Sequence, residues 1–442
     1  MENFLDFYQN KKIGFVGAGI SNVPILKLFA ENGIEVSLRD KKNYDAIPEN
    51  ELLASLGVKF ITGENYLDDI YEDVIFLSPV LRPDLVPFIE AKKKNVLITT
   101  ELEEFLRFCP CTTIGITGSD GKTTTSTLIS KLLEASGKKV YLGGNIGENL
   151  FVKLKEIKSS DFAVIEISSF QLMKMENKPD ISVVTNVSPN HLDWHTDMEE
   201  YISAKRKIVS FNQQRNVLCA DDEITKSFKN EKTIFFGKNE FSDFLYDNEG
   251  IKHKNKLILK DEDILLPGIH NRANYSAAIS AVYPFITNEA IQTVAKTFKG
   301  VEHRIELVDV IDGVSYYNSS IDSSPTRTAA ALNSFNEKVI VISGGYDKKI
   351  PLEPLAPLFE KKAKAVILMG TTGPIIEKIL LGNNYTGKIL RAENMNSAVK
   401  QASSLAQFGD KVILSPAAAS FDLYPNFVCR GNDFKKEVNL LK

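Results

Sequence analysis

The sequence contains few cysteines and no long hydrophobic run. Its four cysteines lack CxxC or zinc-knuckle spacing, so we expect free thiols in a reducing compartment. No apolar stretch approaches the roughly 20 residues that a membrane helix needs. The opening residues, MENFLDF, lack the basic and then apolar segments of a signal peptide. These absences predict a cytoplasmic protein without membrane insertion.

A strong positive charge is also absent. The net charge is -4 and the pI is near 5.9, which argues against a nucleic-acid partner. Any phosphorylated ligand must therefore be held by local features of the fold. A chain of 442 residues predicts about three domains, and the sequence has no internal repeat or low-complexity tract.

Short apolar runs alternate with helix-like segments along the whole chain, for example at 13–16, 74–77, 113–117, 162–167, 182–186, 339–343, 365–369 and 411–414. This alternation predicts an α/β protein with largely parallel sheets flanked by helices. We expect a Rossmann-like domain over residues 1–100, a P-loop-type ATPase domain over 101–300 and a second Rossmann-like domain over 301–442. A β-rich stretch is expected around 216–267.

The strongest motif is TGSDGKTTT at 117–125, between a predicted strand and a helix over 123–135. Gly118 and Gly121 allow close backbone approach to an anion at the helix N-terminus, with Ser119, Asp120 and Thr124 in the same loop. Lys122 would reach the β- and γ-phosphates, and the Thr123 hydroxyl would bind Mg²⁺. The spacing is the shorter T-G-x-x-G-K-T form, because Ile116 stands where the usual first glycine would be.

A second glycine turn, Gly17-Ala18-Gly19-Ile20-Ser21, follows the first predicted strand, and Asp40 ends the next. This partly matches a dinucleotide fingerprint, but the third glycine position is Asn22. A turn that binds a nucleotide diphosphate is the favoured interpretation, and a nicotinamide site is the alternative.

Polar groups gather after predicted strands in the middle of the chain. Glu166 follows the run FAVI and is placed to help hold Mg²⁺. His191 lies in the crowded segment NVSPNHLDWH, and Lys205 on the following amphipathic helix could project back toward it.

Further along the chain, Asn274 at a helix start could bind a base or sugar, and Arg304 could clamp phosphate. The strand-end loops SGGYDK at 343–348 and SPAAASFDLYPNF at 415–427 suit recognition of a carboxylate.

Together these segments resemble the Mur ligase family. The resemblance runs over nearly the whole chain and rests on TGSDGKTTT, GGNIG at 143–147, EISSFQL at 166–172, NVSPNHLDWH, HNRAN at 270–274, EHRIE at 302–306, GGYDKK at 344–349 and LSPAAASFDLYPNF. The last two favour the branch that joins D-glutamate to UDP-N-acetylmuramoyl-L-alanine in peptidoglycan synthesis.

The resemblance implies a mechanism in which the substrate carboxylate attacks the γ-phosphate of ATP. The resulting acyl phosphate is then attacked by the amine of D-glutamate, and phosphate leaves. In-line phosphoryl transfer needs positioning and charge neutralisation more than a covalent nucleophile, which suits the residues of the loop. A monomer with hinges near 100–112 and 299–302 is expected.

The resemblance also assigns residues. Lys122, Glu166, His191 and Lys205 are the implied catalytic residues. It places Mg²⁺, as two ions, on Thr123, Glu166, His191 and Lys205, the last as a carbamate. Asn274 and Arg304 would contact ATP. The UDP-substrate would contact Asn145 as well as the first glycine turn, Asp40, Ser78 and Pro79, and D-glutamate would contact Ser323, Lys348, Ser420 and the backbone at Phe427.

One segment departs from the family pattern. Where the family has N-D-S-K-A-T-N, this chain has Tyr317-Asn-Ser-Ser-Ile-Asp-Ser-Ser, with Ser319 and Ile321 in place of the aspartate and lysine. Asp322 is the candidate for the acidic ATP-binding role from a shifted position. The alternatives left open are another Mur-type or folylpolyglutamate-type ligase, a nucleotide-dependent switch without ligase chemistry, and a nicotinamide dehydrogenase.

Overall fold

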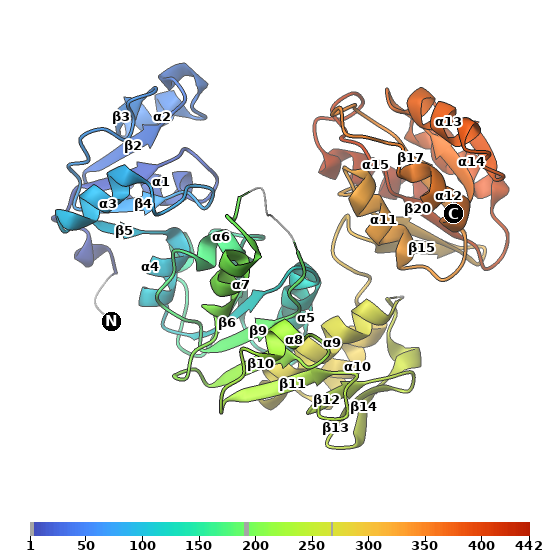
Figure 1. Ribbon diagram of the computed structural model, residues 1–442, viewed down its shortest axis with the longest axis horizontal. Coiled ribbons are helices and arrows are strands. Elements are labelled where there is room, and N and C mark those ends of the chain that lie inside the picture. Colours follow the sequence, from blue (N-terminus) through green and yellow to red (C-terminus); the bar gives the residue numbers. More distant parts are fainter. Residues whose placement is uncertain (1–3, 190–193, 267) are drawn as a thin grey trace. The chain divides into compact units, whose positions relative to one another are not determined.

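The computed structural model describes residues 4–189, 194–266 and 268–442, and over these residues the strands form three sheets (Figure 1). The chain divides into two compact units, Met1–Leu259 with Ala273–Val294, and Lys260–Arg272 with Ala295–Lys442. The predicted α/β class with largely parallel sheets is confirmed, whereas the domain boundaries near residues 100 and 300 stay predictions. Within the described residues, every helix is too short or too polar to span a membrane.

The first sheet, blue in Figure 1, has the strand order β3-β2-β1-β4-β5 and is parallel throughout. Its central strands are buried along their whole length because helices cover both faces, as their continuous apolar runs predict. The strands are β1 Ile13–Val16, β2 Val36–Asp40, β3 Lys59–Thr62, β4 Val74–Leu77 and β5 Leu97–Thr99. The helices are α1 Val23–Glu31, α2 Asn50–Ser55 and α3 Val86–Lys93.

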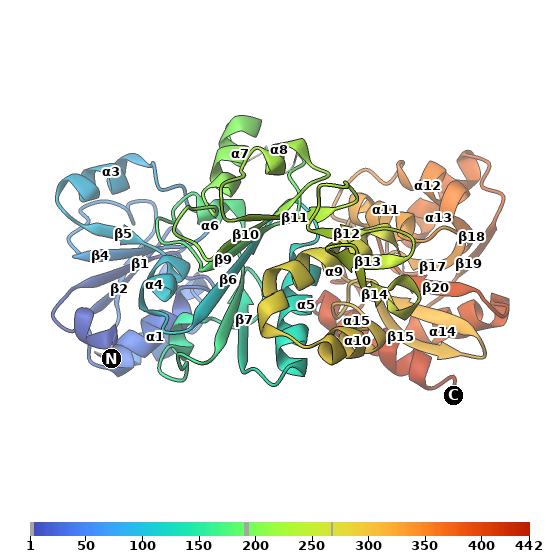
Figure 2. The same ribbon diagram turned by 90° about the horizontal axis from the view of Figure 1, so that it is seen from below.

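The second sheet has the order β14-β13-β12-β11-β10-β9-β6-β8-β7. Its strands are β6 Thr112–Thr117, β7 Val140–Gly144, β8 Phe162–Glu166, β9 Ile181–Val184, β10 Arg215–Cys219, β11 Thr233–Gly237, β12 Phe244–Tyr246, β13 Gly250–His253 and β14 Lys256–Lys260. The helices are α4 Glu101–Phe108, α5 Lys122–Ala135, α6 Ser169–Leu172, α7 Met198–Arg206, α8 Glu223–Lys226, α9 Ile269–Val282 and α10 Asn288–Thr297. In Figure 2, α7 and α8 lie above the strands β9 to β11, and α5 lies below.

The third sheet, in the second unit, has the order β15-β16-β20-β17-β18-β19. The strands β15 and β16 form an antiparallel hairpin, and the other pairs are parallel. The strands are β15 Glu306–Ile311, β16 Val314–Asn318, β17 Val339–Ser343, β18 Ala363–Leu368, β19 Lys388–Arg391 and β20 Lys411–Leu414. The helices are α11 Pro325–Asn333, α12 Leu355–Lys362, α13 Gly373–Gly382, α14 Met395–Leu405 and α15 Phe427–Asn439.

An aromatic cluster joins the first sheet to the segment that follows β7. The Phe15 and Phe76 rings stack at 5.0 Å, and Phe151 contacts Phe76 at 6.1 Å and Phe29 at 5.8 Å. These side chains are fully buried, so their burial favours a fixed packing of the first two sheets.

Helix α4 connects the first sheet to the second and carries a buried acid. Thr100 caps the helix by accepting a hydrogen bond from the Glu103 N–H, and Glu101 follows at the first helical position. Glu101 is only 5% exposed, and its Oε1 has no hydrogen-bond partner among the described residues. Burial raises the pKa of Glu101 to about 8, although the backbone N–H groups of Leu150 and Phe151 counteract this. The folded protein therefore holds this carboxyl neutral at pH 7.

We predict that Glu101→Gln removes a pH dependence of stability. Between pH 4.5 and 8 the unfolded chain ionises Glu101 and the folded chain does not, so the free energy of unfolding of the parent protein falls as pH rises through this window. The loss should be about 3 kcal/mol, and the glutamine variant should lack it. Chemical denaturation at pH 5 and pH 8 measures the difference. The exposed control Glu31→Gln should follow the parent protein, and an unchanged pH slope in Glu101→Gln would contradict the assignment.

Candidate active site at the phosphate loop

The loop between β6 and α5 depends on two glycines. Gly118 has a φ of +150°, and a Cβ there would lie 1.8 Å from Thr185 Oγ1. Gly121 has a φ of +79°, and a Cβ there would lie 2.4 Å from Asn274 Oδ1. Any other residue at either position would have a strained backbone and a Cβ that overlaps a neighbouring side chain, so glycine is required at both. The same distances show that Thr185 and Asn274 form the walls of the loop.

Helix α5 begins at Lys122, directly after the loop. Its N-cap is Gly121, which offers no side chain to the orphan N–H groups of the first turn. An uncapped helix N-terminus preceded by glycines is a ready-made anion site. The Lys122 ammonium donates to the carbonyls of Gly118 at 3.0 Å and Ser119 at 3.1 Å, so the cation lies over the loop. This arrangement fits a triphosphate.

The segment after β9 braces the loop from the other side. Thr185 Oγ1 donates to the Asp120 carbonyl at 2.6 Å, and the Asp120 N–H donates to Asn186 Oδ1 at 2.9 Å. Ser119 Oγ lies 2.9 Å from the Tyr201 hydroxyl of α7. The sequence predicts no role for Thr185, Asn186 or Tyr201. Thr185 and Asn186 nevertheless lie at the start of the segment that contains His191, and Tyr201 lies on the helix that carries Lys205. Their contacts explain why the loop keeps one shape.

Glu166 lies at the end of β8, beside the loop as predicted. Its side chain is 2% exposed and accepts hydrogen bonds from Thr123 Oγ1 and Asn145 Nδ2, each at 2.8 Å. Thr123 and Glu166 thus present oxygen atoms to the same point at the start of α5, and oxygen is the ligand atom that Mg²⁺ prefers. Asn145, predicted to bind the UDP-substrate, contacts Glu166 at the second sheet.

Lys205 extends from α7 into the interior beneath the loop. It is 2% exposed, and its Nζ donates to the Gly118 carbonyl at 2.7 Å. Burial lowers the pKa of Lys205 to about 6, and the nearby Lys122 cation adds to this effect. The amine is therefore largely neutral at pH 7.5, which is the form that reacts with carbon dioxide. Lys205 thus points toward the phosphate loop, whereas its predicted position beside His191 stays a prediction.

The remaining predicted ligand, His191, lies outside the described residues. In residues 4–189, 194–266 and 268–442, no three His, Cys, Asp or Glu side chains form a metal-binding group. The neighbouring oxygens of Thr123 and Glu166 are ligand atoms that fit Mg²⁺. His195, four residues on, has a structural environment: its ring nitrogens contact Ser169 Oγ at 2.9 Å and Glu200 Oε2 at 3.1 Å.

The N-terminal turn assembles at the carboxyl edge of the first sheet. Gly17 has a φ of +96°, and a Cβ there would lie 2.9 Å from the Ser78 Cβ. Asp40 at the end of β2 accepts a hydrogen bond from the Ala18 N–H at 2.7 Å. The turn, Asp40 and Ser78 therefore lie together, which is the usual ligand position in such a sheet. Ile20 in the turn is 93% exposed.

Asn22 replaces the third glycine of the fingerprint for a structural reason. Its side chain is buried and donates to the carbonyls of Val16 at 3.1 Å and Gly17 at 3.0 Å. The amide thus fills the space that a third glycine would leave open and ties the turn to β1. The asparagine at the third glycine position therefore stabilises this turn.

The second unit holds the predicted D-glutamate residues. Ser323 and Lys348 line one small pocket, together with Tyr346, Thr372 and Ala417. Ser420 is buried, and the Phe427 carbonyl at the start of α15 accepts a hydrogen bond from Ser320 Oγ at 2.8 Å.

The divergent segment after β16 places Asp322 in the interior of the same unit. Asp322 is 5% exposed and accepts a hydrogen bond from Ser415 Oγ at 2.8 Å. Burial raises the pKa of Asp322 to about 6, and hydrogen bonds with Ser319 and Ser415 partly offset this effect. The carboxyl group of Asp322 is therefore held in the interior by neighbouring hydroxyl groups.

Comparisons with known proteins agree with this geometry. Residues 116–282 match the Mur ligase middle domain, and residues 303–418 match the Mur ligase, glutamate ligase domain. The chain belongs to the Mur ligase family. The predicted family and ligase class are thereby confirmed.

Relatives cover nearly the full length of this Mur ligase. A UDP-N-acetylmuramoylalanine–D-glutamate ligase from Clostridium botulinum (strain Langeland) is 45% identical, covering 99% of this chain and 98% of its own. The enzyme of that name from Clostridium beijerinckii is 46% identical with the same coverage. Among solved structures, the UDP-N-acetylmuramate-alanine ligase of Thermotoga maritima has a TM-score of 0.60 at 20% identity, covering 98% of this chain and all of its own. This last likeness confirms the fold.

For this Mur ligase we predict that Gly118→Ala abolishes nucleotide binding. The added methyl group would overlap Thr185 Oγ1 and force the loop away from its φ of +150°. Affinity for a fluorescent ATP analogue should fall at least 100-fold, because the loop N–H groups no longer converge. The control is Gly382→Ala at the end of α13, where a Cβ meets nothing within 4 Å. Unchanged nucleotide affinity in Gly118→Ala would refute the assignment of this loop.

Proposed function

We propose that this chain joins D-glutamate to UDP-N-acetylmuramoyl-L-alanine at the expense of ATP, in the synthesis of peptidoglycan precursors. The observation that carries the proposal is the convergence of Lys122, Thr123, Glu166 and Lys205 on one glycine loop. Full-length relatives that bear the name of this ligase support the choice of substrates. We place the reaction in the cytoplasm and expect the enzyme to act as a monomer.

The proposed reaction has two steps. The carboxylate of the UDP-substrate attacks the γ-phosphorus of ATP, so that the bond to ADP breaks and an acyl phosphate forms. The amine of D-glutamate then attacks the acyl carbon, loses a proton, and phosphate leaves as the amide forms. Lys122 and the N–H groups at the start of α5 stabilise the charge on the transferred phosphoryl group.

Metal binding is assigned to the oxygens around Glu166. Thr123, Glu166 and His191 would hold Mg²⁺, with Lys205 contributing through a carbamate. A bound Mg²⁺ would neutralise phosphate charge during transfer. Asn145 orients Glu166 by donating to its Oε1, so one oxygen of this carboxylate is fixed by Asn145 and the other faces Thr123.

Substrate contacts are assigned by their place in the fold. Residues 17–21, Asp40, Ser78 and Pro79 would bind the UDP-substrate, and Asn274, Arg304 and Asp322 would bind ATP. Ser323, Lys348, Ser420 and the Phe427 backbone would bind D-glutamate. The pocket that Ser323 and Lys348 both line supports the last assignment, because a hydroxyl and an ammonium group suit a carboxylate.

We predict that ADP release requires both substrates. With UDP-N-acetylmuramoyl-L-alanine, ATP and Mg²⁺ present, D-glutamate should raise ADP release at least 100-fold over L-glutamate, L-lysine, glycine or D-alanine. A coupled assay over this panel measures the preference. Preference for another amino acid would overturn the substrate assignment. Slow hydrolysis that no amino acid changes would instead indicate a nucleotide-dependent switch.

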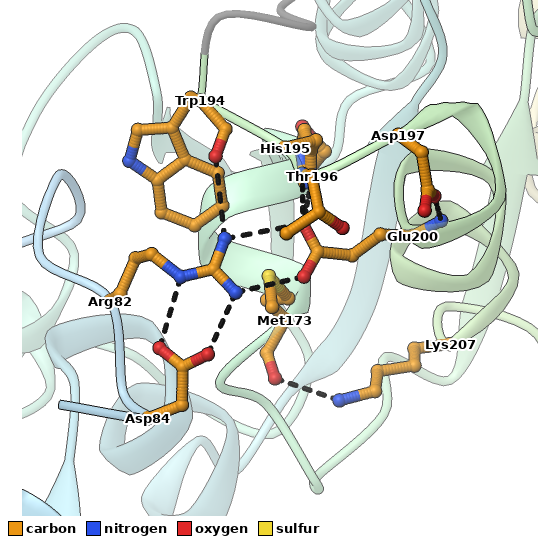
Figure 3. Close-up of polar contacts among 10 residues, drawn as sticks. Arg82, Asp84, Met173, Trp194, His195, Thr196, Asp197, Glu200 and Lys207 are labelled. Carbon is orange, nitrogen blue, oxygen red and sulfur yellow. Dashed lines mark hydrogen bonds and ion pairs between the residues drawn. The ribbon is translucent and has the colours of Figure 1, made fainter. Parts of the chain in front are cut away.

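We also predict that Lys205→Ala lowers the rate of ADP release at least 100-fold, because one positioned charge-stabilising group contributes about 3–4 kcal/mol. Short carboxylates added to the variant should restore part of the rate. In the parent enzyme, ¹³C-bicarbonate should give a carbamate resonance above pH 6, where the amine is neutral, and lose it below. The control Lys207→Ala removes an exposed lysine that donates to the Met173 carbonyl (Figure 3). Full activity or a persisting carbamate signal in Lys205→Ala would refute this role.

A further inference from the structure

The loop after β4 is tied to the second sheet by polar contacts. This loop, residues 78–84, begins with Ser78 and Pro79, both assigned to the UDP-substrate. Lys174, just after α6, donates from Nζ to the Ser78 carbonyl at 2.8 Å and to the Pro79 carbonyl at 2.6 Å. Trp194 Nε1 donates to the Val80 carbonyl at 3.0 Å. The backbone of the substrate loop is thus held by side chains from the segments that follow α6 and precede α7.

Arg82 is the centre of these contacts (Figure 3). Its Nη2 lies 2.8 Å from Glu200 Oε1 and its Nη1 lies 3.2 Å from Glu200 Oε2, a two-pronged pairing that fixes orientation as well as distance. Its Nε and Nη2 pair with Asp84 of the same loop at 3.0 and 2.7 Å. The guanidinium also lies 5.2 Å from the centre of the Trp194 ring. The side chains of Arg82 and Glu200 are 25% and 21% exposed, so solvent only partly screens the pair.

Glu200 lies on α7, the helix that also contacts the phosphate loop. Its carboxylate also accepts hydrogen bonds from the Thr196 N–H, at 2.9 Å, and contacts His195 Nδ1, which fixes the start of the helix. The next residue, Tyr201, contacts Ser119, and one turn later Lys205 contacts Gly118. One short helix therefore contacts the substrate loop through Glu200 and the phosphate loop through Tyr201 and Lys205.

We propose that Arg82, through Glu200, is a positioning residue that holds the UDP-substrate loop at a fixed distance from the phosphate loop. The proposal rests on the proposed function, because it concerns the alignment of the substrate carboxylate with ATP. A displacement of about 1 Å between reacting groups can cost 100-fold in rate, so loss of the pair would slow catalysis indirectly, through their alignment. Arg82 holds the pKa of Glu200 at about 2, so the pair stays ionised throughout the neutral range.

The test uses the full chain and four variants. Arg82→Gln and Glu200→Gln should each lower kcat/KM for the UDP-substrate about tenfold, while KM for ATP stays within twofold. The double exchange of Arg82→Glu with Glu200→Arg restores an opposite-charge pair and should recover at least a third of the loss. The control Arg391→Gln breaks an arginine–glutamate pair of the second unit and should change neither parameter. The proposal would be overturned if the single variants changed KM for ATP as much as kcat/KM for the UDP-substrate and the double variant recovered none of the loss.

A second measurement separates this proposal from the proposed function. Trp194 is the only tryptophan, so intrinsic fluorescence reports on the ring beside Arg82. Arg82→Gln and Glu200→Gln should shift the emission of the free protein equally, and the effects should not add when combined. Additive shifts would refute coupling between the residues whatever the enzyme's substrate. Absence of ADP release by the parent enzyme, with non-additive shifts, would refute the proposed function and leave the Arg82–Glu200 connection standing.

Discussion

The contact between the Lys205 amine and the Gly118 carbonyl is the constraint on which the candidate site depends. An amine buried this deeply loses much of its hydration, so it stays in place only where a carbonyl replaces the lost water. The carbonyl of Gly118 can face inward because the residue has no side chain to collide with Thr185. The glycine, the lysine and the walls of the loop therefore require one another, and a change to any of them alters the position of the phosphates.

Parallel strands explain why residues from distant parts of the chain meet at this loop. The strands β6, β8 and β9 are neighbours and run in the same direction, so Thr117, Glu166 and Thr185 leave the sheet at the same edge. The α5 N-terminus begins at this edge as well, which adds a partial positive charge. With a net charge of -4 over the chain, anion binding must come from such local arrangement, and Lys122 and the N–H groups of α5 provide it.

Local patterns predicted the parts of the fold that local physics determines. The runs at 13–16, 74–77, 339–343 and 411–414 form strands with those bounds, because apolar runs of only four or five residues, rich in Val and Ile, favour buried strands over helices. Helix α5 begins one residue before its predicted start. The edge strands β3 and β19 give a weaker sequence signal, since short segments of mixed polarity resemble loops. Glu166 could be chosen from a motif and Lys205 from its amphipathic helix and the family resemblance. The Tyr201–Ser119 contact, however, depends on how α7 packs, which no short segment encodes.

The Arg82–Glu200 pair is a second contact that short sequence segments do not predict. The two residues are 118 positions apart, and neither stands in a recognisable motif. Their pairing follows from two independent facts, the turn of the loop after β4 and the start of α7 at its Asp197 cap. The aromatic cluster around Phe151 keeps the first two sheets packed together, so the pair does not bear the cost of bringing them into contact. The ion pair then only has to favour one alignment of the substrate loop with the phosphate loop over others of nearly equal energy. The modest energy of a partly exposed ion pair is sufficient for this.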